Sequence, residues 1–298
     1  MTNHQIDKTC GVIRPFSPQL TSILGWAYPM LDHGFIRITD YMGTDESICQ
    51  AARVSYGRGT ETKSTNEGLI RYLMRHRHTT PFEMCEIQFH VKMPIFVMRQ
   101  WIRHRTANVN EYSARYSILD REFYMPEPEV MAVQSTTNNQ GRGEVLSPED
   151  SAMVLEMMKK DAHRAYDNYE EMCDPEGFGL ARELARMNLP TSIYTQAYWK
   201  IDLHNLLHFL SLRADPHAQY EIRVYAEKML ELIKMWVPSA VQAFEDYQMG
   251  ALNFSQQESN ILGCLLNGDT PDLSNLSQRE QREFNQKLDK MGYIHEQN

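Results

Sequence analysis

A short stretch between Arg99 and Ser117 concentrates side chains that bind anions. It contains Arg99, Arg103, Arg105 and Arg115 together with His104, two asparagines and several hydroxyls, and its one acid is Glu111. A solvated helix face usually alternates charge signs, so that acids and bases support each other four residues apart. Here the acids are missing, and the positive charge must be met by a group outside the stretch. Because forked arginine donors match phosphate oxygens, the stretch predicts a phosphate-binding site.

The charge of the whole chain makes this stretch a local exception. The sequence has 30 Lys and Arg against 39 Asp and Glu, a formal net charge of -9. From residue 71 to residue 115, however, eight basic residues face three acidic ones. An acidic protein is poorly suited to attract a nucleic-acid backbone from a distance. We therefore expect a pocket for a small anionic ligand and no nucleic-acid partner.

Composition and length indicate a globular, cytoplasmic protein. The 298 residues are 42% hydrophobic, which is ample for a core. No apolar run reaches the roughly 18 residues of a membrane span, and the first residues lack the apolar centre of a secretory signal. The five cysteines, Cys10, Cys49, Cys85, Cys173 and Cys264, show no paired spacing. We expect neither a disulfide framework nor a zinc ribbon, and no membrane partner.

Alternating apolar and β-branched residues predict the strands. They occur at residues 35–42 and 83–93, and residues 191–199 are expected to be a short strand or an extended link. Residues 1–34 contain several prolines and no sustained periodicity, so we expect an N-terminal extension, with regular structure beginning at Phe35. Residues 251–298 change in composition and are expected to form a C-terminal tail with one helix near 277–291.

Helical periodicity predicts the remaining elements. A long helix is expected from Ser147, an N-cap candidate followed by proline and two acids, to about Cys173. The other expected helices cover residues 45–55, 66–77, 95–105, 176–187, 202–212 and 216–236. Residues 106–117 are expected to be a loop or irregular strand, and residues 126–143 an insertion. Together these elements predict an α/β (α+β) fold, with a mostly antiparallel sheet packed against long helices.

One motif in the basic stretch resembles that of a known enzyme family. Arg103-His104-Arg105, followed after seven residues by Ser113, resembles the signature of flavin-dependent thymidylate synthases. The flanking sequences are similar too: Arg-Gln-Trp-Ile before the motif, Arg-His-Thr-Thr-Pro-Phe-Glu upstream and Leu-Arg-Ala-Asp-Pro-His-Ala-Gln downstream. The resemblance covers residues 35–250, which it identifies as the catalytic domain.

The resemblance implies a reaction and its cofactors. The chain would methylate dUMP to dTMP, with 5,10-methylenetetrahydrofolate as carbon donor, FAD as hydride carrier and NADPH as reductant. It also implies a homotetramer whose sites form between subunits. Arg213 would stabilise negative charge on the uracil ring and act with Ser113 as a catalytic residue. The substrate-binding positions would be Gln100, Arg103, Glu111, Ser113, Ala114, Arg115, Arg186 and Arg213, with the phosphate held by Arg115 and Arg186.

The same resemblance implies the flavin-binding positions. These are Ser55, His78, Thr80, Glu83, Arg103, His104, Arg105, Asn110, Glu111, His204, His208 and His217. The chain departs from the family at Asp202 and His204, where members often have Asn and Arg, so the adenine end of FAD is expected to be held differently here.

Two alternatives from other classes remain open. His204, His208 and His217 could serve a metal-dependent hydrolase, which predicts bound zinc or iron and no flavin spectrum. Residues 99–115 could serve a nucleic-acid-binding module, which predicts steeply salt-dependent binding. A cysteine nucleophile is not expected, because no cysteine lies near a base or in the motifs. No metal site is expected.

Overall fold

The structure, a computed structural model, describes residues 14–54, 64–136 and 141–293. Ser55 and Cys10 therefore lie outside the described residues. The chain divides into two compact units, residues 1–245 and residues 246–298. The second unit contains α11 (Gln256–Leu266) and α12 (Gln278–Lys290), whose buried Ile261, Phe284 and Leu288 form a small core with Leu276.

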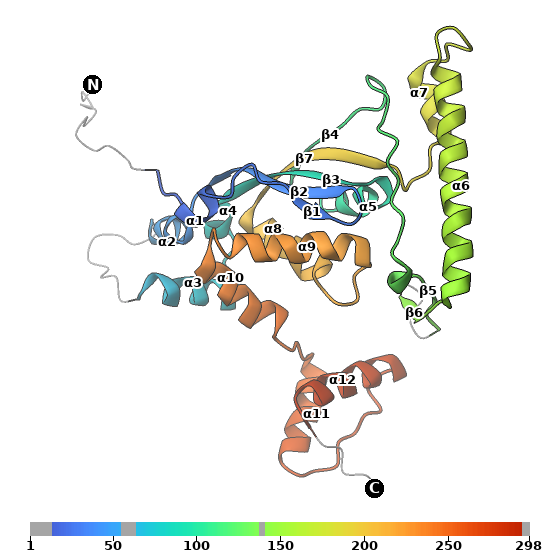
Figure 1. Ribbon diagram of the computed structural model, residues 1–298. Helices are drawn as coiled ribbons and strands as arrows, with labels where there is room; N and C mark the ends of the chain where they lie inside the picture. Colours follow the sequence, from blue (N-terminus) through green and yellow to red (C-terminus); the bar gives the residue numbers. More distant parts are fainter. Residues whose placement is uncertain (1–13, 55–63, 137–140, 294–298) are drawn as a thin grey trace, which may run out of the picture. The chain divides into compact units, whose positions relative to one another are not determined.

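The first unit is built on a five-stranded sheet in the order β1-β2-β3-β7-β4 (Figure 1). Every neighbouring pair in it is antiparallel. This confirms the predicted mixed fold with an antiparallel sheet. The strands are β1 (Tyr28–Met30), β2 (Gly34–Met42), β3 (Glu86–Pro94), β4 (Asn108–Glu111) and β7 (Tyr194–Asp202).

Side chains alternate between the two faces of this sheet, as the strand period requires. On β3, Ile87, Phe89 and Val91 are buried, while the residues between them are partly exposed. The buried face packs against α5 (Ile95–Trp101), α8 (Leu203–Arg213) and α9 (Tyr220–Ile233). The Trp101 ring lies 5.2 Å from that of Trp199 and 4.9 Å from that of Phe209, so aromatic contacts join α5, β7 and α8.

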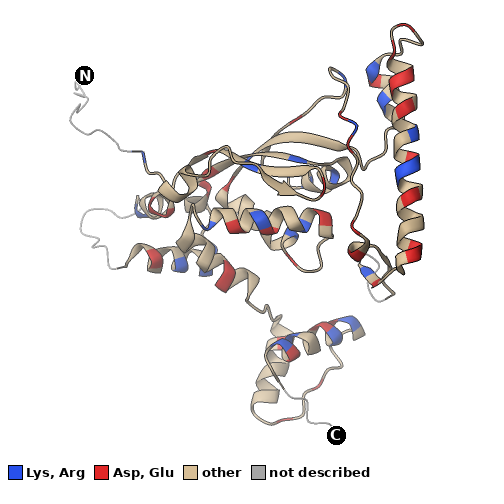
Figure 2. Cartoon of the chain, in the orientation of Figure 1, with Lys and Arg blue, Asp and Glu red and all other residues tan. Residues whose placement is uncertain are grey.

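A second core of the first unit lies against one side of the long helix α6 (Pro148–Cys173). The Ser147 Oγ accepts a 3.1 Å hydrogen bond from the Asp150 N–H, which confirms the predicted N-cap. Tyr166 and Tyr169 of α6 pack with Phe123 and with Ala185 of α7 (Arg182–Ala185). Acidic and basic residues are mixed along the exposed parts of α6 (Figure 2).

Shorter elements complete the unit and link its main parts. They are α1 (Pro18–Thr21), α2 (Asp45–Arg53), α3 (Asn66–Arg75), α4 (Thr80–Glu83), α10 (Pro238–Phe244), the hairpin β5 (Ala132–Gln134) and β6 (Arg142–Val145), and single turns at Pro128–Val130 and Arg186–Asn188. A further helical turn, Glu245–Met249, begins at the last residue of the first unit and continues into the second. No helix among the described residues is long and apolar enough to cross a bilayer.

Several predicted boundaries are wrong, each for a local reason. The helix expected to reach Arg105 ends at Trp101, because the N–H groups of Arg103 and His104 bond to carbonyls three residues back rather than four. The strand expected from Glu83 begins at Glu86, because Pro81 in a first helical turn starts α4 instead. Regular structure also begins before Phe35, with α1 and β1.

Two further helices are shorter than predicted, and four helices, α1, α4, α10 and α11, were not predicted. The segment 176–187 forms only α7 and one turn, because Gly179 takes a left-handed conformation at φ +54°. The helix expected from Pro216 begins at Tyr220. Neither α10 nor α11 was predicted, and the segment expected to be a tail therefore holds two helices.

Candidate functional site

The first group of predicted site residues lines a cavity beside the end of α5. The cavity has a volume of about 400 Å³. Its lining consists of Arg103, His104, Arg105, Thr106, Ile201, Asn205, His208, Leu212 and Arg213. Three arginines and no acid are among these residues, so the cavity favours an anionic ligand.

Arg213 is held in this cavity by a histidine. Its Nε donates a 3.1 Å hydrogen bond to Nε2 of His104. Burial, and then the nearby Arg213 and His208, lower the pKa of His104 to about 4. The imidazole is therefore neutral at pH 7 and able to accept this bond. Its ring also packs edge-on against Phe209 at 4.8 Å. The guanidinium of Arg213 therefore has a fixed orientation, and within the described part of the chain its other N–H groups make no hydrogen bond, which leaves them for a ligand.

A second group lines another cavity of about 480 Å³, between β4 and the α7 turn. The predicted residues Glu111, Ser113, Ala114 and Arg186 are part of its lining. The Thr195 hydroxyl donates a 2.9 Å hydrogen bond to Glu111, which fixes that carboxylate on the sheet. Ala114 is buried in the α6 core, and this packing holds the loop that carries Ser113.

Arg115 already has a partner next to this second cavity. Its Nε and Nη2 donate to one carboxylate oxygen of Glu183, on α7, at 3.2 and 2.9 Å. Both side chains are about half exposed, so the pair adds little stability. A phosphate that enters the cavity has to compete with Glu183 for Arg115.

A third group lies in the turn between α3 and α4 and on α4, at a cavity of about 1090 Å³. His78 and Thr80 line it together with Arg77 and Tyr72, and no acid is among the lining residues. The His78 and Tyr72 rings are stacked at 5.9 Å. Arg77 has φ +56°, a left-handed conformation at the end of α3 that is unfavourable for a residue with a Cβ. Glu83 lies on α4, next to this group in the chain.

The remaining predicted residues lie apart from these cavities. Gln100 donates a hydrogen bond to Gln219, and His217 bonds to Asp215 at 2.8 Å. Asn110 is exposed on β4, and His204 is partly buried on α8. Asp202, one of the two positions that depart from the family, is the N-cap of α8 and accepts bonds of 2.9 and 2.8 Å from Asn205.

The histidines of the hydrolase alternative do not form a metal site. Among the residues that the structure describes, no three His, Cys, Asp or Glu side chains are grouped closely enough to hold a metal ion. His204 and His208 are thus two residues of one helix, and His217 is paired with Asp215.

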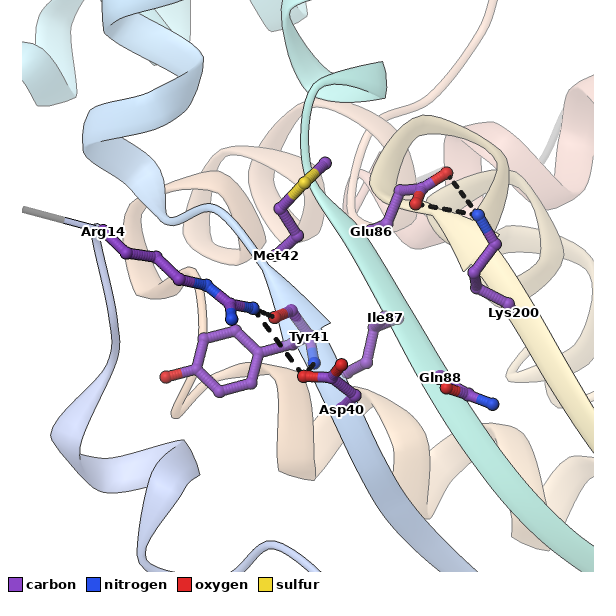
Figure 3. A pocket seen from close by; sticks show the side chains of 8 residues that line it. All are labelled: Arg14, Asp40, Tyr41, Met42, Glu86, Ile87, Gln88 and Lys200. Carbon is purple, nitrogen blue, oxygen red and sulfur yellow. Dashed lines mark hydrogen bonds and ion pairs between the residues drawn. The ribbon is translucent and has the colours of Figure 1, made fainter. Parts of the chain in front are cut away.

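A fourth cavity, of about 450 Å³, lies on the face of the sheet opposite to the one that packs against the helices (Figure 3). Its charged side chains are paired with each other: Lys200 with Glu86 at 2.8 Å and Arg14 with Asp40 at 3.7 Å. The cavity therefore has no excess charge to bind an anion, and none of the predicted site residues lines it.

The described cysteines nearest the sheet are not suited to be nucleophiles. Cys49 and Cys85 are fully buried. Burial raises the pKa of the Cys85 thiol to about 12, and it also raises the pKa of Cys49. Because the thiolate is the reactive form, neither side chain is poised to attack a substrate.

The structure also shows residues around the site that were not predicted from the sequence. They are Arg142, Glu183, Gln219 and Glu221. Gln219 is the last residue of the family-like segment Leu-Arg-Ala-Asp-Pro-His-Ala-Gln, and its place in that segment is a signal from which it could be predicted. Arg142 and Glu221 are 79 residues apart, and no local pattern reveals that they meet.

Comparisons with known proteins find one family of similar sequences. A family model described as thymidylate synthase complementing protein matches residues 37–239. A flavin-dependent thymidylate synthase of Ruegeria pomeroyi is 66% identical over 274 residues, which are 91% of this chain and 91% of that protein. One from Gluconobacter oxydans is 58% identical over 278 residues, 93% of this chain and 92% of that protein.

Solved structures show the same similarity. The crystal structure of PolB, a UMP/dUMP methylase from Streptomyces cacaoi bound with 5-Br UMP, superposes with a TM-score of 0.67 at 33% identity. The alignment covers 74% of this chain and 97% of that one. The structure of PolB bound with 5-Br dUMP gives a TM-score of 0.66 at 31% identity, over 74% of this chain and 98% of that one.

Proposed function

The chain belongs to the family of flavin-dependent thymidylate synthases, and on that premise we propose that it methylates dUMP to dTMP. The carbon donor is 5,10-methylenetetrahydrofolate, the hydride carrier is FAD and the reductant is NADPH. The observation that carries the proposal is the acid-free cavity that Arg103, Arg105 and Arg213 line together, with Arg213 oriented by His104. The curated relatives and the dUMP-analogue complexes of PolB support the choice of cofactor and substrate.

The residues of the first and third cavities fit a flavin dinucleotide. Arg103 and Arg105 offer forked donors for its diphosphate, and the acid-free lining leaves their charge uncompensated. His78 would contact the cofactor from the turn after α3, and Thr80 and Glu83 from α4. The set would be completed by His204, His208, His217, Asn110 and Ser55. When bound, FAD supplies hydride transfer, which the side chains of this protein do not provide.

The second cavity fits the nucleotide phosphate. Arg115 and Arg186 would bind its oxygens, and Ser113 and the Ala114 N–H would add donors. Arg213 would act at the other end of dUMP, on the uracil ring, where a guanidinium stabilises negative charge as it develops. Its hydrogen bond to neutral His104 keeps the guanidinium oriented before the ring arrives.

Flavin content tests the proposal at its base. The purified protein should be yellow, and denaturation should release FAD in proportion to subunits. Colourless protein that FAD does not reconstitute would refute the assignment. Stoichiometric zinc or iron in such protein would return the hydrolase alternative.

A homotetramer with composite sites is part of the same proposal. The three cavities of one chain share no lining residue, although one dUMP and one FAD must contact members of all three sets. Residues of neighbouring copies would complete each site. Mixed oligomers of an Arg115→Ala chain and an Arg213→Ala chain should then recover activity, because some sites contain neither substitution. Mixed oligomers as inactive as the parents would contradict composite sites.

A further inference from the structure

Glu221 is a buried carboxylate with an unusually complete set of donors. It lies in the first turn of α9 and is 2% exposed. Its Oε1 accepts from the Tyr124 hydroxyl at 3.1 Å and from Arg142 Nη2 at 2.6 Å. Its Oε2 accepts from Arg142 Nη2 at 2.8 Å and from Gln219 Nε2 at 2.9 Å. A buried charge with four hydrogen bonds and a cationic partner is held rigidly.

The acceptor character of Glu221 fixes the orientation of two amides in series. An ionised carboxylate only accepts hydrogen bonds, so Gln219 has to present its NH2 group to it. The carbonyl end of Gln219 then accepts from Nε2 of Gln100. Gln100 is thereby turned so that its NH2 group faces Gln219, which leaves its carbonyl oxygen and one N–H for other partners.

The partners of Glu221 keep this arrangement in place. Burial, and then Glu221 itself, raise the pKa of Tyr124, whose hydroxyl therefore remains protonated and a donor. Arg142 is brought in by β6 and also bonds to the Val130 carbonyl at 3.1 Å. Arg142, which lies within the insertion expected at residues 126–143, thus supplies the counter-ion of Glu221.

Gln100, Gln219 and Glu221 connect the elements that carry the site arginines. Gln100 lies on α5, three residues before Arg103, and Gln219 ends the loop that follows Arg213. Arg223 fixes the same loop by donating a 2.7 Å bond to the Pro216 carbonyl. A shift of Glu221 would therefore move or release the amide of Gln100.

We propose that Glu221, with Arg142 as its counter-ion, is a positioning residue that acts through Gln219 on Gln100 and so on nucleotide binding. The inference rests on the proposed function, in which Gln100 borders the nucleotide. Neither Glu221 nor Gln219 reacts. Their effect is to present one fixed face of the Gln100 amide to the bound substrate.

The test is a set of steady-state measurements on holoenzyme variants. Gln219→Met removes both hydrogen bonds of the relay and leaves the buried ion pair intact, so KM for dUMP should rise about five- to tenfold, as for a lost hydrogen bond. The kcat should stay within about twofold. Gln100→Met, which also loses the contact with the nucleotide, should raise KM for dUMP at least as much, and the double variant should be no worse than Gln100→Met alone. Glu221→Gln should raise KM similarly, because a neutral amide can present either end to Gln219. Gln88→Met, a glutamine on the other sheet face, is the matched control.

The outcomes separate the two proposals. Effects of Gln219→Met and Gln100→Met that multiply in the double variant would overturn the relay, as would an unchanged KM in Gln219→Met. Melting temperatures show whether Glu221→Gln unfolds, and the Gln219→Met result decides the question in that case. Wild-type enzyme that forms no dTMP would overturn the proposed function and the relay with it, whereas wild-type turnover with multiplying effects overturns the relay alone.

Discussion

The contact between His104 and Arg213 depends on the charge of the imidazole. A protonated His104 would have no lone pair for the Arg213 N–H and would repel the guanidinium. Burial prevents this at neutral pH by lowering the pKa of His104 to about 4. His104 and Arg213 can thus lie in contact because the imidazole is neutral, and Arg213 retains its positive charge for the ligand.

This charge state gives a pH dependence of stability. The pKa of His104 is 6.5 in a model compound and about 4 in the fold, so the unfolded chain binds more protons between these values. The contribution of His104 is fully present above pH 6.5 and is lost as pH falls through about 4. The difference in unfolding free energy between wild type and His104→Gln should shrink over this window in denaturant titrations. A difference that does not change between pH 7 and pH 4.5 would contradict the assignment.

Arg115 and Arg213 should differ in which kinetic constant they control. Arg115 would bind the phosphate before and during reaction, so Arg115→Ala should mainly raise KM for dUMP. The rise should correspond to a loss of about 2 to 4 kcal/mol of binding free energy. Arg213 would meet charge that develops during reaction, so Arg213→Ala should slow flavin oxidation even at saturating dUMP. Stopped-flow measurement of reduced-flavin oxidation distinguishes them. Full recovery of Arg213→Ala at saturating dUMP would make Arg213 a binding residue only.

At the scale of single elements, local signals in the sequence predict the long, regular parts. The caps and periodicity of residues 147–173 predicted α6, and alternation predicted β2 and most of β3. Ser255 and Glu258 form a capping box, and this local pattern is a signal in the sequence from which the start of α11 could be predicted. The end of α5 at Trp101 could not be predicted, because it depends on His104 turning back toward Phe209 and Arg213.

The sequence predicts which residue types belong to the proposed site, but it does not predict how these residues are distributed over the fold. The motif around Ser113 gives the residue types, because their charges have no partners nearby in the chain. The pairing of Arg115 with Glu183 and of Arg142 with Glu221 joins residues 68 and 79 positions apart. Such contacts follow from tertiary packing and leave no periodic trace in the sequence.

The turn after α3 gives a prediction at the scale of an element. Arg77 takes a left-handed conformation at the position where helices usually end in glycine. Arg77→Gly should therefore be more stable to unfolding than Arg77→Ala by about 1 kcal/mol, because both lose the side chain and only glycine relieves the backbone. Denaturant unfolding of the two variants checks this. Equal stability, or a more stable Ala variant, would show that the turn is not strained.

At the scale of the whole molecule, the arginines of one chain are distributed rather than gathered. Arg115 is paired with Glu183 and Arg213 is held by His104, whereas Arg77 lies at the third cavity with His78. This distribution is what a site shared between copies requires, since each chain then brings a different part of the lining. An overall charge of -9 is compatible with it, because the basic residues are confined to a few segments.

Formation of dTMP tests the central claim most directly. Wild-type protein carrying FAD, given NADPH, dUMP and 5,10-methylenetetrahydrofolate without oxygen, should produce dTMP in a 1:1 ratio to NADPH consumed, as measured by chromatography and absorbance. Omission of dUMP or of the folate should abolish the product, and so should removal of the flavin. NADPH oxidation without dTMP, or dTMP formation by flavin-free protein, would contradict a flavin-dependent thymidylate synthase.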